Sequence, residues 1–182
     1  MAGWFETTAS RVVYAGRGTV RIDTVQMPDG EEAEREIVEM PDAVAVVAVT
    51  DGSEVFLLKQ YRQAVGTYVL EIPAGIIDDE DASPAAAARR ELVEEIGHDG
   101  EVEPLTVFLN SAGWSTERTH VFLARAPRPA AAPDDFVVEH EELDMEIVRL
   151  PMTQAVALVA SGEISDSKTV IGLLLADRAL TD

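Results

Sequence analysis

Residues 75–97, GIIDDEDASPAAAARRELVEEIG, join an acidic loop to a well-marked helix. Ser83 is a candidate N-cap, Pro84 stands at the first helical position, and an alanine run follows. Gly97 is suited to the end of the helix, because glycine readily adopts the left-handed conformation found there. The segment therefore predicts a helix that begins near Pro84 and ends at Gly97.

Three carboxylates lie at helical spacing near the end of this segment. Glu91, Glu94 and Glu95 stand at i, i+3 and i+4, so a helix presents them on one face, where like charges repel. Hard divalent ions such as Mg²⁺ take oxygen ligands, commonly a few carboxylates with water and substrate phosphates. The pattern indicates a metal site, and an ordinary solvated acidic helix face is the alternative interpretation.

The same segment resembles the signature of the Nudix hydrolases. That signature is a glycine, five residues, a glutamate, seven residues, and then Arg-Glu-aliphatic-x-Glu-Glu-x-Gly-aliphatic. The interval before the arginine is one residue longer here, so no glutamate stands in frame, and Glu80 or Asp81 is the candidate for that acidic position. His98 replaces the last aliphatic residue. The matching positions are Gly75, Arg90, Glu91, Leu92, Glu94, Glu95 and Gly97.

Composition is typical of one enzyme domain. The chain has 182 residues and no cysteine, which excludes disulfides, thiolate metal sites and a cysteine nucleophile. We see no signal peptide and no apolar run that approaches the length of a membrane span, so we expect a soluble cytoplasmic protein. Fourteen basic against thirty-four acidic residues give a formal charge of −20, which opposes binding to nucleic acid. We expect a small-molecule partner, with neither nucleic acid nor membrane.

Periodicity and turn signals predict strands before the central helix, more strands after it and helices at the end. This order predicts an α+β fold, which the resemblance specifies as a Nudix-type α/β/α sandwich with a mixed sheet. Residues 1–41 form a predicted antiparallel strand extension and residues 42–182 the hydrolase domain. Residues 127–133 are predicted to be irregular. The predicted strands are 11–18, 19–26, 43–50, 55–60, 69–72, 102–108, 119–125 and 146–150, and the later helices are 153–160 and 167–180.

Outside the signature, nearly everything after Arg11 resembles the ADP-ribose pyrophosphatases. Ala112 departs from that pattern, because the subfamily has proline at its position. The resemblance implies Mg²⁺-dependent hydrolysis of the diphosphate bond of ADP-ribose, or of a related ADP-sugar, to AMP and ribose 5-phosphate, with Mn²⁺ as a substitute ion. The matching segments are 35–49, 59–62, 71–75, 111–114, 139–145 and 162–169.

The resemblance also implies roles for single residues. Glu91, Glu94, Glu95 and the backbone carbonyl of Ala74 are the expected metal ligands, with Glu95 also counted as catalytic. Arg90 is expected to hold the carboxylates in place rather than to contact substrate.

The expected substrate contacts lie outside the signature helix. Arg62 is assigned to the diphosphate, where a guanidinium can bind two oxygens at once, and a solvated arginine at a strand end is the alternative. Arg35 and Glu39 are assigned to the nucleoside end, with an exposed ion pair between them as the alternative. Trp114, which follows Gly113, is expected either to stack on adenine or to pack its own loop.

The general base is expected on an acidic loop late in the chain. Glu141 and Glu142 are the candidates that the resemblance implies. His140 is a rival because its ordinary pKa lies near neutrality, but it ranks third because a lone histidine in an acidic loop is usually solvated. A plain acidic surface run is the alternative interpretation.

Two other functions and one assembly remain open from the sequence. A Nudix hydrolase could act on another nucleoside diphosphate derivative or on a nucleoside triphosphate, or the fold could serve as a catalytically silent ligand sensor. The retained glutamates argue against silence. We expect a homodimer, because a small strand extension must pack on something and the resemblance implies exchange of that element between two copies.

Overall fold

The computed structural model describes residues 5–132 and 143–181, and these form two units. The first unit comprises residues 1–42 and 109–118, and the second comprises residues 43–108 and 119–182. None of the helices in the described residues has the length and apolar character that crossing a bilayer requires.

The first unit is an antiparallel sheet of three strands in the order β1-β2-β3. The strands are β1 (Thr7–Ala15), β2 (Thr19–Gln26) and β3 (Glu32–Glu39). A turn precedes β3, with Gly30 at φ +90°, a conformation that glycine adopts without steric cost. The connection 109–118 joins this sheet, because the Val38 N–H donates to the Trp114 carbonyl and the Thr116 N–H to the Val38 carbonyl.

The second unit is built on a seven-stranded mixed sheet with the central order β12-β5-β4-β10-β9. Two further strands, β6 and β7, pair with β5 and β4. The central strand β4 is parallel to β10 and antiparallel to β5. The strands are β4 (Ala43–Val49), β5 (Glu54–Arg62), β6 (Thr67–Glu71), β7 (Ala74–Ile76), β9 (Val102–Leu109), β10 (Arg118–Arg125) and β12 (Glu146–Pro151).

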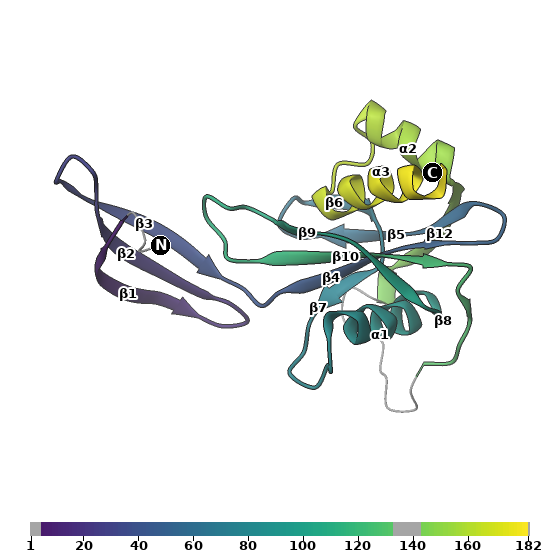
Figure 1. Ribbon diagram of the computed structural model, residues 1–182, viewed down its shortest axis with the longest axis horizontal. Helices are drawn as coiled ribbons and strands as arrows, with labels where there is room; N and C mark the ends of the chain where they lie inside the picture. Colours follow the sequence, from purple (N-terminus) through teal and green to yellow (C-terminus); the bar gives the residue numbers. More distant parts are fainter. Residues whose placement is uncertain (1–4, 133–142, 182) are drawn as a thin grey trace. The chain divides into compact units, whose positions relative to one another are not determined.

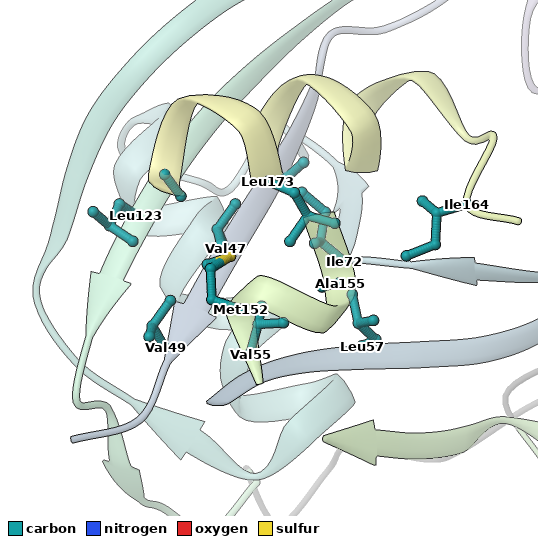
Figure 2. Close-up of a cluster of buried hydrophobic side chains, with 12 residues drawn as sticks. Val47, Val49, Val55, Leu57, Ile72, Leu123, Met152, Ala155, Ile164 and Leu173 are labelled. Carbon is teal, nitrogen blue, oxygen red and sulfur yellow. The ribbon is translucent and has the colours of Figure 1, made fainter. Parts of the chain in front are cut away.

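Helices cover both faces of this sheet. Figure 1 shows α1 (Pro84–Ile96) on one face and the pair α2 (Met152–Ser161) and α3 (Ser167–Thr181) on the other. Side chains of a strand alternate between its two faces, so the apolar run of β4 feeds both cores. One core lies against α1 and includes Val44, Val46 and Ala48. The other core lies under α2 and α3 (Figure 2) and includes Ala45, Val47 and Val49. A strand that is apolar at every position is therefore explained by burial on both sides.

Gly172 lets α3 approach this sheet closely. A Cβ atom at that position would lie 2.9 Å from both Ile72 Cδ1 and Val47 Cγ2, which is tighter than real carbon contacts. The small residue thus sets the distance between helix and sheet.

The predicted α+β sandwich and its longer elements are confirmed, with small shifts at their ends. The prediction that residues 127–133 are irregular was wrong in part. Arg128–Pro129 form the short strand β11, which pairs antiparallel with β8 (His98–Asp99) directly after α1.

Candidate active site

The caps of α1 fix which residues of the helix face the sheet. Ser83 has an extended backbone and its hydroxyl oxygen accepts a hydrogen bond from the Ala86 N–H. At the other end Gly97 adopts φ 64°, and its N–H reaches the carbonyls of Leu92 and Val93. Both predicted caps are confirmed.

Glu91 is buried between α1 and β7, with 7% of its surface exposed. A Cβ atom on Gly75 of β7 would overlap the Glu91 carboxylate, so this position needs a residue without a side chain. Burial raises the pKa of Glu91 to about 7, although the neighbouring Arg90 opposes the shift.

Glu95 lies one helical turn further on and contacts the same strand. Its Oε2 accepts a hydrogen bond of 2.8 Å from the Ala74 N–H. Burial raises the pKa of Glu95 to about 8, and the charge of Glu91 adds to the shift, whereas the Ala74 N–H and the charges of Lys168 and Arg62 oppose it. The surroundings of the two carboxylates therefore disfavour two negative charges.

Arg90 ties the acidic loop to the helix. Its Nη1 donates to Glu91 Oε1 at 2.8 Å and to Glu94 Oε2 at 3.0 Å. Its Nη2 donates to the Ile76 carbonyl at 3.0 Å and to Asp81 Oδ2 at 2.9 Å. Arg90 thus orients two of the carboxylates while it joins both ends of the loop.

The acidic position left open by the longer loop is taken by Asp81. The hydrogen bond from Arg90 lowers the pKa of Asp81, and the Asp78 N–H also donates to its carboxylate. Glu80 is exposed. The extra residue therefore places an aspartate, rather than Glu80, against the arginine.

A second charged cluster lies where β5, β6 and α3 meet. Arg62 donates from Nε and Nη2 to the two oxygens of Glu71, both at 2.7 Å. The Lys168 Nζ donates to Glu71 Oε2 at 2.5 Å and to Asp166 Oδ1 at 3.0 Å. Glu71 is 2% exposed. Sequence reasoning named Arg62 and missed Glu71 and Lys168, although both lie in segments that carry the resemblance.

This cluster borders a cavity of about 380 Å³. Its lining combines apolar side chains from β6 and from the connection between β5 and β6 with charged residues. The lining includes Arg62, Val65, Val69, Ser165, Asp166 and Lys168.

The residues assigned to the nucleoside end belong to the first unit, whereas the carboxylates of α1 belong to the second. Arg35 and Glu39 bond to other groups rather than to each other. Arg35 donates to the Glu34 carbonyl and contacts Met27 Sδ, whereas Glu39 accepts from Arg21 Nε at 2.9 Å.

The Trp114 side chain is 54% exposed. A side chain at Gly113 would meet open space. Packing of the tryptophan within its own loop is therefore limited, and an aromatic face is left accessible in the first unit. The candidates for the general base, Glu141 and Glu142, and their rival His140 lie outside the described residues.

The donor chemistry of the α1 face fits a hard divalent ion. Among residues 5–132 and 143–181, no three acidic or histidine side chains are grouped closely enough to hold an ion together. Arg90 engages Glu91 and Glu94, and the Glu95 carboxylate is turned to the Ala74 backbone. Burial nevertheless raises the pKa values of the Glu91 and Glu95 carboxyl groups. A bound cation would lower these pKa values again, because it favours the charged carboxylates.

Comparison with known proteins places the chain in a family. Residues 39–169 match the model of the NUDIX domain, so the chain belongs to the Nudix family, as its signature helix and α/β/α layers predict. It is a Nudix hydrolase by class.

Individual relatives extend over most of the chain. The chain is 36% identical over 179 residues to an ADP-ribose pyrophosphatase of Mycobacterium tuberculosis, covering 97% of this chain and 85% of that protein. It is 33% identical over 174 residues to an ADP-ribose pyrophosphatase of Bacillus subtilis, with coverages of 92% and 90%. It is also 33% identical over 172 residues to a methanol dehydrogenase activator of Bacillus methanolicus, with coverages of 92% and 90%.

A solved structure shares the fold. The crystal structure of an ADP compounds hydrolase superposes with a TM-score of 0.83 and covers 97% of this chain and 94% of that one, at 21% identity.

Proposed function

We propose that this chain is a cytoplasmic enzyme that hydrolyses the diphosphate bond of ADP-ribose, or of a related ADP-sugar, to AMP and ribose 5-phosphate. The observation that carries the proposal is the pair of carboxylates on one helix face, buried Glu91 and partly buried Glu95, beside the cations Arg62 and Lys168. Relatives named ADP-ribose pyrophosphatase, similar over 97% and 92% of the chain, support this choice of substrate. The absence of cysteine suits a reducing cytoplasm.

Glu91, Glu94, Glu95 and the Ala74 carbonyl are the residues that would hold Mg²⁺, with Mn²⁺ as a substitute. A bound divalent ion supplies charge neutralisation at the diphosphate and lowers the pKa of the attacking water. The protein's own part is to present oxygen donors on a rigid helix, and Arg90 contributes by orienting Glu91 and Glu94.

Proton transfer is assigned to the acidic loop late in the chain. Glu141 or Glu142 would accept the proton of the attacking water, and His140 is the less favoured candidate. In the first unit, Arg35, Glu39, Gly113 and Trp114 remain assigned to the nucleoside end, where the exposed indole offers a stacking surface.

A substrate panel tests this function. AMP release is measured with Mg²⁺ and with Mn²⁺ for ADP-ribose, other ADP-sugars, ATP, dinucleoside polyphosphates and capped RNA. We expect the highest kcat/KM for ADP-ribose. If a nucleoside triphosphate has a much higher kcat/KM than ADP-ribose, the chain acts on a different class of Nudix substrate. Inactivity on every substrate, with ADP-ribose still bound, would favour the silent ligand sensor.

We also propose that the active unit is a homodimer formed through the first unit. Its strand β1 is exposed along its whole length, and Val12 and Tyr14 expose 61% and 62% of their surface. In the described part of this unit, Asp23 is the single buried residue of the three strands, so the sheet has little core of its own. A second copy could cover these apolar side chains.

A further inference from the structure

The cavity beside Arg62 lies close to the carboxylates of α1 along the chain. Glu71, which lines the cavity and bonds to both cations, precedes Ala74 by three residues, and the Ala74 N–H contacts Glu95. Three residues span at most about 11 Å. A ligand in the cavity would therefore be within reach of the proposed metal face.

The hydrogen bonds already made at the cavity indicate what kind of group it can bind. Both oxygens of Glu71 accept from Arg62, and one also accepts from Lys168. The carboxylate of Asp166 is likewise engaged, by Lys168 through one oxygen and by the backbone and hydroxyl of Thr169 through the other. The acidic side chains are therefore occupied from within the protein.

Arg62 and Lys168, in contrast, have N–H groups that are not used in these hydrogen bonds. Among the described residues, Arg62 uses Nε and Nη2, which leaves the two hydrogens of Nη1. An ammonium group has three donors, and Lys168 uses two of them on Glu71 and Asp166. Although its formal charges cancel, the cavity offers donors and few acceptors. Such a lining suits a ligand rich in anionic oxygens.

Stability alone is a weak reason for this cluster. Buried ion pairs are often no more stabilising than apolar residues of similar volume, because both charges lose their hydration. Lys59 and Lys168 are the two lysines of a chain with 34 acidic residues, and Lys168 is the one held against a buried carboxylate at a cavity wall.

We propose that Arg62 and Lys168 together bind the diphosphate oxygens of the substrate in this cavity, and that buried Glu71 is the positioning residue that holds both cations. The inference rests on the proposed function, to which it adds Lys168 as a second binding cation. Glu71 fixes the plane of the Arg62 guanidinium through two parallel hydrogen bonds, so that Nη1 keeps one direction.

The two lysines permit a test that does not need turnover. Protein labelled with ¹³C-lysine should give two sets of ε-methylene resonances, which Lys59→Arg and Lys168→Arg assign. Inorganic pyrophosphate is then titrated without divalent ions. We expect a saturable shift of the Lys168 signal and none for Lys59, whose partner is the exposed Glu146. Equal shifts of both signals, or no shift of Lys168, would overturn the proposal.

Steady-state kinetics test whether Lys168 binds the substrate or only neutralises the charge of Glu71. Lys168→Met should raise KM for ADP-ribose at least about tenfold, the loss expected for one charge-assisted hydrogen bond. Lys168→Arg should recover much of it, and Lys59→Met should match the unaltered enzyme. Glu71→Gln should raise KM more than it lowers kcat, because Arg62 and Lys168 lose their fixed orientation.

The double variant Glu71→Gln with Lys168→Met decides the role of Lys168. If the lysine only neutralises Glu71, adding Lys168→Met to Glu71→Gln would leave KM at the value of the single Glu71→Gln variant. We expect the added change to raise KM further, and an equal KM in the single and double variants would overturn the proposal. If the unaltered chain binds pyrophosphate through Lys168 but does not hydrolyse ADP-ribose, the proposed function fails while this inference stands.

Discussion

Glu91 and Glu95 carry negative charge where the structure disfavours it. Burial raises both pKa values, and the helical spacing brings the two charges together. Arg90 satisfies Glu91 only in part, because it also serves Glu94 and Asp81. A fold that selected for stability alone would place neutral side chains here, so these residues are where function is expected to oppose stability.

Replacing either carboxylate by its amide should therefore separate activity from folding. Glu91→Gln and Glu95→Gln should each lower kcat at least about 100-fold, because a neutral amide is a poor ligand for a hard cation. Melting temperatures should stay equal or rise, since a desolvated charge is removed. Glu101→Gln, at an exposed position, is the control. Near-normal kcat of both variants at saturating Mg²⁺ would contradict the metal assignment.

The same two groups predict how the stability of the metal-free protein depends on pH. Their folded pKa values, about 7 and about 8, lie above the ordinary 4.5, so the folded state binds more protons than the unfolded state between these limits. Stability should therefore be highest near pH 5 and fall by a few kcal/mol as pH rises to 8.

Urea denaturation in EDTA measures this dependence. The double variant Glu91→Gln with Glu95→Gln should show a flatter profile over the same range. A profile that rises from pH 5 to 8 in the unaltered protein would contradict the burial of these charges.

For a single residue, the sequence predicts its place in the site when its partners are near in the chain. The spacing of Glu91, Glu94 and Glu95 indicates a shared helix face, and the one-turn spacing to Glu94 also places Arg90 beside it. The contact between Glu71 and Lys168 joins residues 97 positions apart. No local period encodes such a pair, so only the packing of α3 against β6 reveals it.

Among the elements, α3 depends on one small residue for its distance from the sheet. Gly172→Ala would force a methyl group against Ile72 and Val47, each 2.9 Å from the added atom. Alanine favours the helix by about 1 kcal/mol, but overpacking a tight core costs about 1–3 kcal/mol. We expect a lower urea midpoint with an unchanged m-value.

Gly52→Ala supplies the control for this change. The nearest atom to a Cβ there is Thr50 Oγ1 at 3.7 Å, an ordinary contact, and stability should hardly change. Equal stability of Gly172→Ala and the unaltered protein would show that α3 can move away from the sheet at no cost.

Element prediction succeeded for most segments long enough to show a period, although the eight-residue strand β3 was not predicted. The apolar run of β4 and the two caps of α1 are strong local signals, and the structure confirms them. Strands β7, β8 and β11 have three, two and two residues, too few for alternation to appear. β7 is held by its pairing with the longer β4, and β8 and β11 are held by pairing with each other.

For the whole molecule, the exposed strand β1 predicts how the chain assembles. Val12→Glu combined with Tyr14→Glu should give a monomer in light scattering, because two charges would oppose burial of this surface in a dimer. KM for ADP-ribose should rise if a second copy completes the nucleoside pocket. Leu180→Glu, an exposed apolar position on α3, is the control.

A monomeric unaltered protein with full activity at assay concentration would contradict the dimer. A truncation that removes residues 1–41 and keeps a normal KM would contradict the role of this extension in substrate binding.

The parallel pairing of β4 with β10 also has a consequence for biosynthesis. Ala43 pairs with Thr119, so the central strand waits for a partner made 76 residues later. At ribosomal rates of about 5–20 residues per second, this takes about 4 to 15 seconds. During that interval one edge of AVAVVAV, a segment without charge or proline, is open to other nascent chains. The acidic excess of the chain, which gives the finished fold no advantage toward an anionic substrate, then acts as mutual repulsion that keeps incomplete chains apart.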